Sequence, residues 1–353
     1  MAAGPNPGGP TILVTGATGF TGSHLVRSLV RTGSRIRVLA RSAPRATGVL
    51  PAGVEIIAGE VDDRSAISRA VAGSDIVYHV AAAYREARHT DQYYWDVNVG
   101  YTSHLLDAAK ATGVQRFVHC STVGVMSHIE HPPADEQHPH QPADIYQYTK
   151  SQAEKLALAA HREHGLPVAV ARPTAIYGPG DTRLLKMFRL IAERRFVMLG
   201  FREIYYHMVH VNDLVAGLRL LGERPQAVGE VFILGGARYY KLRTIVGLIA
   251  AAVGAPPPRW RLPAWPFQVA GTICEKICIP LGIEPPLYRR RVDFFTKSRA
   301  FTIDKARRLL GYSPAIDLEV GIPATVEWYQ AHGLLPKAVS PQGLPAPLLD
   351  KEL

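Results

Sequence analysis

A tyrosine and a lysine stand four residues apart, at Tyr146 and Lys150, in a stretch that has the pattern of the first turns of a helix. Residues i and i+4 share one face of a helix, so the lysine ammonium can lie beside the tyrosine phenol. A phenol with a pKa of about 10 acts as an acid or base near neutral pH only when such a cation stabilises its phenolate. The pair therefore predicts proton transfer to or from a substrate oxygen.

Three glycines, Gly16, Gly19 and Gly22, follow the short apolar run 11–15 and open a stretch of helical pattern. A glycine-rich turn between a strand and a helix places the phosphates of a dinucleotide at the helix N-terminus, where unpaired N–H groups favour negative charge. We therefore expect a dinucleotide cofactor. The alternative is a tight turn that holds no ligand.

The residues after the second expected strand bear on the choice of dinucleotide. No Asp or Glu occurs from 23 to 54, where an acidic residue would bind the ribose 2′-hydroxyl of NAD. Arg41 follows the strand instead, with Arg37 and Arg45 nearby, and guanidinium groups suit a 2′-phosphate. NADP is therefore favoured over NAD. The alternative is that these arginines only solvate the edge of the sheet.

Short β-branched runs alternate with amphipathic helical stretches through the first two-thirds of the chain. This alternation predicts an α/β fold, a Rossmann-type doubly wound parallel sheet with helices on both faces. A long helix is expected near 91–112, and Asp144 with Gln147 has the pattern of a capping box ahead of the helix that carries Tyr146. The expected strands are 11–15, 35–39, 54–58, 75–81, 116–121, 167–172 and 231–234.

From about residue 177, prolines and glycines divide the chain into short pieces, which predicts a smaller, discontinuous C-terminal lid that binds the substrate. We expect an NAD(P)-binding Rossmann domain at 11–176 with 208–235, and the lid at 177–207 with 236–335. Residues 1–10 have the composition of a loose leader without a signal peptide, and 336–353 that of a tail.

Charge and cysteine content limit the partners. The 353 residues include 40 Lys and Arg against 30 Asp and Glu, a net charge of +10 that suits a phosphorylated cofactor, an acidic substrate or an anionic surface. The basic residues are scattered, so no nucleic-acid partner is expected.

The three cysteines form neither a zinc pattern nor a disulfide framework, which fits a cytoplasmic protein. No apolar stretch is long enough for a transmembrane segment. Peripheral membrane contact stays open at the run 289–291, where a solvated basic face is the alternative.

Three segments together carry a family resemblance: Thr-Gly-Ala-Thr-Gly-Phe-Thr-Gly at 15–22, Ser121-Thr122, and Tyr146-x-x-x-Lys150. They resemble the extended short-chain dehydrogenase/reductase superfamily of the NAD-dependent epimerase/dehydratase type. The resemblance implies an enzyme in which Thr122 orients the substrate oxygen and Tyr146 transfers its proton. Lys150 would bind the nicotinamide ribose and lower the pKa of Tyr146. It also implies a homodimer formed by the helices near 91–112 and 144–164.

The resemblance extends to the residues around the cofactor and the substrate. Glu60 stands where the family usually has an Asp that contacts adenine, Asn98 would support the site from the long helix, and Arg172-Pro173 would flank the nicotinamide. With Arg41 included, the expected cofactor-binding set is Gly16, Thr18, Gly19, Phe20, Gly22, Arg41, Glu60, Val61, Val80, Ala81, Ala82, Asn98, Lys150, Arg172 and Pro173. The expected substrate contacts are Tyr84, Val123 and Tyr177.

Residues 284–314 resemble bacterial relatives of 3β-hydroxysteroid dehydrogenase and sterol-4-carboxylate 3-dehydrogenase. This resemblance implies an oxidoreductase that interconverts a secondary alcohol and a ketone on a bulky apolar substrate, either steroid-like or a β-hydroxy or β-keto compound. Apolar side chains of the lid would then wall a hydrophobic pocket, or else form ordinary lid core. They are Trp260, Trp265, Phe267, Phe294 and Phe295.

Other functions are weighed against this one. Dehydratases of the family carry Asp-Glu directly after the active-site Thr, where this chain has Val123 and Gly124, which disfavours dehydration. A nucleotide-sugar 4-epimerase using bound NAD is the main alternative. Tyr206 replaces the diphosphate-binding Arg of many such epimerases, although Arg183, Arg189 or Arg202 can substitute. A nonenzymatic dinucleotide sensor is disfavoured by the Tyr/Lys pair.

Four histidines, at 128, 131, 138 and 140, lie in a Pro-rich stretch that has the pattern of a surface loop, so no metal is expected.

Overall fold

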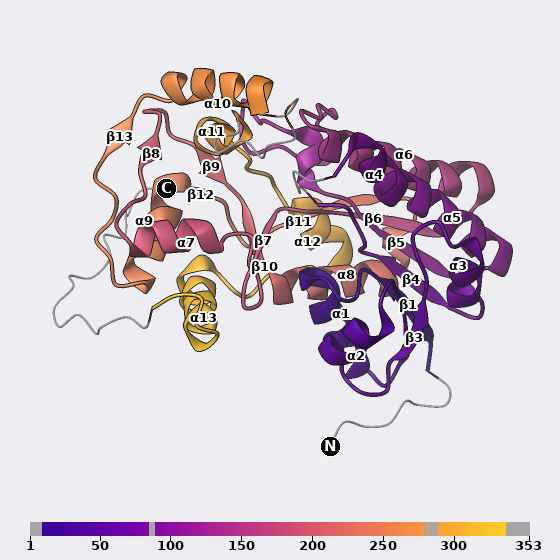
Figure 1. Ribbon diagram of the computed structural model, residues 1–353. Coiled ribbons are helices and arrows are strands. Elements are labelled where there is room, and N and C mark those ends of the chain that lie inside the picture. Colours follow the sequence, from indigo (N-terminus) through magenta and orange to yellow (C-terminus); the bar gives the residue numbers. More distant parts are fainter. Residues whose placement is uncertain (1–8, 85–88, 279–280, 282–288, 337–353) are drawn as a thin grey trace. The chain divides into compact units, whose positions relative to one another are not determined.

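A computed structural model describes residues 9–84, 89–278, 281 and 289–336 of the chain. The chain divides into two units, each with its own internal packing (Figure 1). Unit 1 comprises Met1–Ile176, His207–Arg238 and Ala300–Ala315, and unit 2 comprises Tyr177–Tyr206, Tyr239–Arg299 and Ile316–Leu353. Nearly all of the expected leader and tail lies outside the described residues.

Unit 1 is built on a seven-stranded parallel sheet in the order β11-β6-β5-β4-β1-β2-β3. The order reverses between β1 and β4, and the carboxyl ends of the strands beside such a switch point are where ligands bind in open α/β sheets. The predicted Rossmann-type fold is therefore confirmed. The strands are β1 (Thr11–Thr15), β2 (Arg35–Ala40), β3 (Glu55–Ala58), β4 (Ile76–His79), β5 (Arg116–Cys120), β6 (Val168–Pro173) and β11 (Val231–Leu234).

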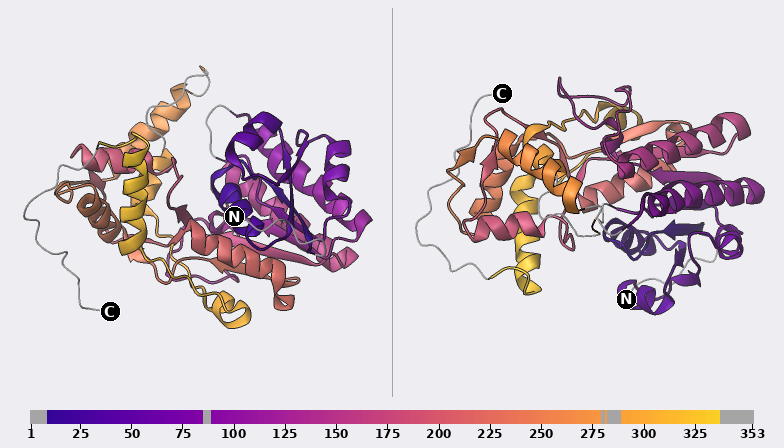
Figure 2. Two further views of the ribbon diagram at one scale, coloured as in Figure 1. Left: turned by 90° about the horizontal axis from the view of Figure 1, so that it is seen from below. Right: turned by 45° about the horizontal axis from the view of Figure 1, so that its top comes forward.

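Helices cover both faces of this sheet (Figures 1 and 2). On one face, Ile12 and Val14 of β1 share a buried core with α1 (Phe20–Val30) and α8 (Val211–Glu223). On the other, Leu13 shares a core with α3 (Arg64–Val71) and α6 (Ile145–His164). Because successive strand residues point to opposite faces, one apolar strand supplies both cores. The remaining elements of unit 1 are α2 (Ala43–Val49), α4 (Asp91–Trp95), the π-turn η1 (Asp96–Gly100), α5 (Tyr101–Thr112), η2 (Val123–Met126), β10 (Met208–His210), η3 (Pro225–Ala227) and α12 (Asp304–Leu310), with β7 (Ala175–Tyr177) at its boundary.

Unit 2 contains helices and two-stranded pairings of its own. Its helices are α7 (Leu185–Ala192), α9 (Leu242–Ala252), α10 (Trp265–Cys278), α11 (Arg289–Thr296) and α13 (Leu318–Ala331). Its strands pair β9 (Tyr205–Tyr206) with β12 (Tyr240–Lys241), and β8 (Met198–Leu199) with β13 (Arg261–Leu262). Phe188 and Tyr329 meet edge to face inside it, with ring centroids 5.3 Å apart.

One segment lies in a different unit from the one expected. Residues 300–315 were assigned to the lid, but they return to unit 1, where Ala306 and Leu310 join the core around β11. The Tyr312 hydroxyl donates a hydrogen bond to the Gly235 carbonyl at 2.9 Å. The expectation followed position along the chain, whereas the segment is held by contacts with residues far from it in sequence.

The long helix expected near 91–112 is present but interrupted. A single π-turn, η1, joins α4 to α5 and carries the buried Asn98. π-turns inside helices often lie at functional sites because they re-aim one side chain. Across the described residues, no helix combines the length and the hydrophobicity needed to cross a membrane.

Candidate active site

The glycine turn joins β1 to α1 with no room for side chains. Gly16 has φ +71°, and a Cβ there would lie 2.6 Å from the Ala81 backbone nitrogen. A Cβ on Gly22 would lie 2.1 Å from the Gly16 carbonyl oxygen. Gly19 caps α1 without any side-chain hydrogen bond, and the N-terminus of a helix favours a negatively charged group. The turn therefore has the form that a dinucleotide phosphate requires.

A groove of about 290 Å³ in unit 1 begins at this turn. Nine of the expected cofactor-binding residues line it: Gly16, Thr18, Gly19, Arg41, Glu60, Val61, Val80, Ala81 and Ala82. Phe20, Gly22, Asn98, Lys150, Arg172 and Pro173 do not line it. The groove thus joins the ends of β1, β2 and β4 into one surface, the edge at which open α/β sheets bind their ligands.

The residues that form one wall of this groove were not predicted from the sequence. Tyr93, Val97 and Tyr101 line it from α4, η1 and α5. These residues recur every four positions, so they mark one face of the helical stretch. That spacing could have identified them once the stretch was expected to pack beside the glycine turn.

The three arginines near β2 have different surroundings. Arg41 and Arg45 line the groove. Arg37 instead places its Nε 3.0 Å from a Glu55 carboxylate oxygen and donates hydrogen bonds to the carbonyls of Ala70 and Ala72. Two guanidinium groups are therefore left beside the groove, rather than the three that the sequence suggested.

Tyr146 lies in the first turn of α6 and is 8% exposed. Asp144 is the N-cap and accepts a hydrogen bond from the Gln147 backbone N–H at 2.8 Å, as predicted. The Gln147 side chain, however, accepts from the N–H of Ala143, one residue before the cap, so the expected capping box is not formed in its usual way. This start of α6 fixes the position of Tyr146 next to the sheet.

Lys150 lies one turn further along α6 and is buried. Its ammonium donates a hydrogen bond to the Cys120 carbonyl at 2.7 Å, at the end of β5. Burial lowers the pKa of Lys150 to about 8, although the nearby Cys120 and Glu154 act in the opposite direction. The lysine therefore holds a positive charge near neutral pH inside the protein, one helical turn from the Tyr146 phenol.

The two hydroxyls after β5 have different partners. Ser121 donates a hydrogen bond to the Glu154 carboxylate at 2.6 Å. Thr122 caps η2, where its oxygen accepts from the Gly124 N–H at 3.0 Å. Since that oxygen serves as an acceptor there, this contact does not use the proton of the Thr122 hydroxyl.

Asn98 connects two parts of the site. Its side-chain oxygen accepts from the Ala83 N–H at 2.8 Å, and its amide donates to the Thr149 hydroxyl at 3.0 Å. Asn98 therefore ties the segment after β4, which lines the groove through Ala81 and Ala82, to the turn of α6 that carries Tyr146 and Lys150.

The expected substrate contacts differ in accessibility. Tyr84 is 43% exposed and meets the Tyr146 ring edge to face, with centroids 5.3 Å apart. Val123 is almost fully buried beside Thr122. Tyr177 is buried in unit 2, where its hydroxyl donates to the Asp317 carbonyl at 3.4 Å, so its ring packs in the interior of that unit.

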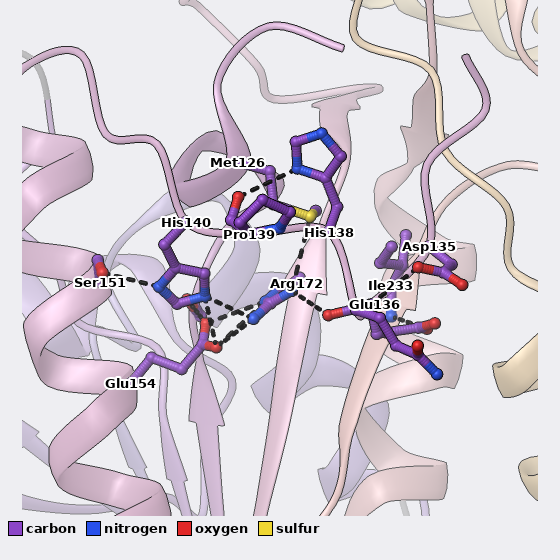
Figure 3. A network of polar contacts seen from close by, with 12 residues as sticks. Met126, Asp135, Glu136, His138, Pro139, His140, Ser151, Glu154, Arg172 and Ile233 are labelled. Carbon is purple, nitrogen blue, oxygen red and sulfur yellow. Dashed lines mark hydrogen bonds and ion pairs between the residues drawn. The ribbon is translucent and has the colours of Figure 1, made fainter. Parts of the chain in front are cut away.

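A buried ionic network lies further along α6 (Figure 3). Two nitrogens of the Arg172 guanidinium donate to the Glu154 carboxylate, the shorter contact being 2.6 Å. His140 Nε2 lies 2.6 Å from Arg172 Nη2, and His140 Nδ1 lies 2.8 Å from the Ser151 hydroxyl. Because a guanidinium can only donate, His140 Nε2 is the acceptor of the hydrogen bond with Arg172.

This network gives Arg172 a role that the sequence did not predict. Burial would raise the pKa of Glu154, but the hydrogen bonds and positive charge of Arg172, together with the hydrogen bond from Ser121, reverse this and lower it to about 2. Arg172 also donates to the Glu136 carbonyl, while the Glu136 carboxylate accepts from the Ile233 N–H. The Arg172 side chain thus holds β6, α6 and the segment before α6 together and does not reach the groove.

Two buried histidines, His79 and His119, lie side by side at the ends of β4 and β5. His79 is held between the hydroxyls of Thr15 and Thr102 at 2.8 and 2.9 Å, and burial lowers its pKa to about 3. Neither ring nitrogen of His119 has a hydrogen-bond partner, and burial lowers its pKa as well. Both rings stay neutral, so Lys150 is the cation of this region. Within the described ranges, no group of three or more His, Cys, Asp or Glu is placed to hold a metal ion.

Comparison with known proteins agrees with this geometry. Residues 12–235 match the NAD dependent epimerase/dehydratase family. The chain is 32% identical over 322 residues to the 4-hydroxy-2-methyl-3-oxo-4-farnesyl-3,4-dihydroquinoline-1-oxide ketoreductase of Stigmatella aurantiaca, covering 88% of this chain and 94% of that protein. It is 29% identical to a 3 beta-hydroxysteroid dehydrogenase/Delta 5-->4-isomerase of Mycobacterium tuberculosis, covering 90% of each.

Among solved structures, gox2253 matches with a TM-score of 0.79 and 30% identity, covering 92% of this chain and 99% of the other. The chain therefore belongs to the NAD-dependent epimerase/dehydratase family. It is an oxidoreductase of that family, built on a Rossmann-type sheet.

Proposed function

We propose that this oxidoreductase uses NADP to interconvert a secondary alcohol and a ketone on a bulky apolar substrate, with Tyr146, Lys150 and Thr122 at the reacting oxygen. The observation that carries the proposal is the position of Lys150. Lys150 lies one helical turn after Tyr146, and its ammonium donates a hydrogen bond to the carbonyl of Cys120, the last residue of β5 and two residues before Thr122. This contact supports a site in which two potential donors and one cation would lie at the edge of the sheet that carries the groove.

The groove suits a dinucleotide. The glycine turn would hold the phosphates, and Ala81 and Ala82 would lie against the middle of the molecule. Arg41 and Arg45 would hold a 2′-phosphate, which favours NADP, while Glu60 in the same groove is the residue that opposes this preference. The bound nicotinamide supplies or accepts the hydride.

The protein's own residues handle the proton. Tyr146 would give its phenolic proton to the carbonyl oxygen during reduction and take one from the alcohol during oxidation. The Lys150 ammonium stabilises the resulting phenolate. A hydrogen bond donated by Thr122 would hold the substrate oxygen within reach of Tyr146, and this positioning supplies part of the rate.

The substrate class is supported by the relatives and by aromatic side chains of unit 2. The two relatives are named for a farnesylated quinoline and for a hydroxysteroid, both bulky and largely apolar. In unit 2, Phe294 and Phe295 form a half-buried cluster with Phe196 and Tyr206. Trp260 and Trp265, which were expected to wall the same pocket, lie on the surface instead.

Epimerisation of a nucleotide sugar is the second candidate, favoured by one observation. Tyr206 stands where many epimerases have an arginine, but Arg299 donates a hydrogen bond to the Tyr206 hydroxyl and lies over its ring at 5.6 Å. A cation is therefore present next to this position. Of the expected substitutes, Arg183 is bound to Asp181 and Arg189 contacts the Leu334 carbonyl.

The test is a nicotinamide absorbance screen of steroid alcohols, β-keto acids and nucleotide sugars with both cofactors. Tyr146→Phe is expected to lower kcat by about 10²- to 10⁴-fold while cofactor binding is kept. Tyr148→Phe is the matched control, because Tyr148 lies on the same helix but is 45% exposed. Equal turnover by wild type and Tyr146→Phe would refute the mechanism. Copurifying NAD with conversion of a nucleotide sugar and no net redox change would favour the epimerase.

A further inference from the structure

We propose that unit 2 carries a docking surface for an anionic lipid bilayer, formed by one face of α10 and the adjoining strand β13. This lipid-facing surface comprises Phe201, Trp260, Leu262, Trp265, Val269, Ile273, Ile277 and Leu281. The inference rests on these side chains and on the charges around them, and it does not depend on the substrate or the reaction proposed above.

The first observation is a stripe of exposed apolar side chains along α10. Trp265, Val269, Ile273 and Ile277 recur every four residues and are between 52% and 68% exposed. Leu281, four residues further on, is 66% exposed. Such spacing normally marks the buried face of a helix. Here α10 lies against α11 (Figure 1). Gly271 of α10 is buried, whereas the apolar side chains of the stripe are exposed.

The second observation is that the stripe continues onto β13 and the adjoining turn. Trp260 and Leu262 flank Arg261 in β13 and are exposed, Trp260 by 76%. The Gly200 N–H donates to the Leu262 carbonyl at 2.7 Å, which places the next residue, Phe201, beside this strand, where it is 66% exposed. Exposed apolar side chains thus follow one another along the chain from Trp260 to Ile277, and exposed apolar groups in such numbers mark interaction sites.

The charge around the surface decides which partner fits it. Residues 255–299 contain eight Lys and Arg against three acidic residues. Arg259 and Lys276 are exposed at the two ends of the surface, and Arg202 follows Phe201. The nearby Glu203 is shared by Arg243 at 3.4 Å and Arg261 at 3.8 Å, so its negative charge is offset. Cations beside an apolar face complement anionic headgroups above an acyl layer.

The residue types favour a bilayer over a protein partner. Tryptophans prefer the boundary between headgroups and acyl chains, and two of them lie at one end of the surface. With 14 residues, α10 is too short to span a bilayer but long enough to lie along its surface. The surface therefore matches an element that rests on the membrane.

The experiment is co-sedimentation of the full chain with vesicles of phosphatidylcholine alone or mixed with phosphatidylglycerol. We expect binding to the anionic vesicles that weakens with added salt, because the charged part of the attraction is screened. The variant Val269→Ser/Ile273→Ser should bind at least about tenfold less, since it removes two apolar side chains from the acyl layer. Both positions are half-exposed, so the fold should survive.

Val320→Ser is the matched control, because Val320 is equally apolar and 66% exposed on α13 of the same unit. Its vesicle binding should equal that of the wild type. Brominated acyl chains should quench tryptophan fluorescence in the wild type, and Trp260→Phe/Trp265→Phe should lose this quenching. The proposal is overturned if the wild type does not bind anionic vesicles, or if Val320→Ser loses as much binding as the double variant. It is equally overturned if the double variant keeps vesicle binding but changes the oligomeric state in ultracentrifugation, which would make the surface a protein interface.

Discussion

At the residue scale, Lys150 shows how burial sets the chemistry of the site. The pKa of a lysine ammonium in water is about 10.5, but burial in the folded protein lowers the pKa of Lys150 to about 8. The buried charge costs stability at neutral pH, and the Lys150 ammonium donates a hydrogen bond to the Cys120 carbonyl. A costly charge held beside a tyrosine is typical of a functional site rather than of a core.

The substitution Lys150→Met tests this cost. Between pH 8 and 10.5 the unfolded chain keeps a proton that the folded chain has lost, so this lysine makes the free energy of unfolding rise with pH across that window. Relative to Lys150→Met, the wild type should therefore gain about 3 kcal/mol between neutral pH and pH 10.5. Urea unfolding at several pH values measures the difference, with the exposed Lys155→Met as control. A difference that is constant with pH would contradict the assigned burial effect.

The substitution Arg41→Ala tests the proposed cofactor preference. Loss of a charge-assisted hydrogen bond to a 2′-phosphate should raise the Kd for NADP by about 10- to 100-fold and leave that for NAD almost unchanged. Arg37→Ala is the control, because its guanidinium is bound to Glu55 and to backbone carbonyls. Fluorescence titration with both cofactors gives the values. If the chain binds NAD in preference to NADP, and Arg41→Ala leaves both affinities unchanged, the phosphate role of Arg41 is wrong.

At the element scale, α6 organises the site along one face. Tyr146, Lys150 and Glu154 follow at intervals of four residues, so they lie on successive turns. Lys150 binds the end of β5, and Glu154 accepts a hydrogen bond from Ser121, which follows β5. Glu154 also binds Arg172 in β6 (Figure 3). The position of Tyr146 relative to the sheet therefore depends on contacts made two turns away.

Glu154→Gln should reveal this dependence. The variant keeps the shape of the side chain but leaves the buried Arg172 charge without its counterion, which should lower the free energy of unfolding by about 3–5 kcal/mol. The lowered pKa of Glu154 also means that its stabilisation is present above pH 4.5 and is lost as the pH falls toward 2. The variant should lack this acid-dependent loss. Thermal unfolding against pH measures both effects.

Glu163→Gln provides the comparison, because Glu163 is exposed near the end of the same helix. Replacing both partners of the buried pair with apolar residues, as in Glu154→Leu/Arg172→Met, should recover part of the stability, since no uncompensated charge remains. If Glu154→Gln is as stable as the wild type at neutral pH, the network does not hold α6 in place.

At the scale of the whole molecule, both units are assembled from separate stretches of the chain. Unit 1 holds the glycine turn, the groove and the Tyr146–Lys150 pair, while unit 2 holds the aromatic cluster and the lipid-facing surface. The outer side of α6 also exposes Tyr148 and Leu156, eight residues apart, and Trp95 of α4 meets Tyr148 with ring centroids 5.9 Å apart. An exposed apolar face on these helices suits the homodimer that the family resemblance implies.

Tyr148→Arg tests whether α6 forms the interface of the expected dimer. A charged side chain in the middle of an apolar interface should raise the dimer dissociation constant by at least about tenfold. Analytical ultracentrifugation over a range of concentrations measures this, and Val320→Arg in unit 2 is the control for added surface charge. If the wild type sediments as a monomer at all concentrations, or if both variants dissociate alike, α6 is not the dimer interface.

Several features could be predicted from the sequence because they depend on local patterns. Strand ranges such as Thr11–Thr15 and Val231–Leu234 match the prediction residue for residue. The glycine turn was predictable because only glycine fits where backbone atoms approach so closely, and the Tyr146–Lys150 pair because both residues lie within one helix.

Other features needed the tertiary structure. Arg37 and Arg41 cannot be told apart from the sequence, because both are arginines in or next to the second strand. The tertiary structure pairs Arg37 with Glu55 and places Arg41 at the groove. Trp260 and Trp265 were expected to wall a pocket or to lie in the core of the lid, but the structure leaves both exposed. The elements that form and the residues that share a face follow from the sequence, because helix and strand geometry is local. Contacts between distant segments set the burial of each residue, its charge partners and the return of residues 300–315 to unit 1. The lowered pKa of Lys150 and the buried pair of Glu154 and Arg172 therefore depend on the tertiary structure.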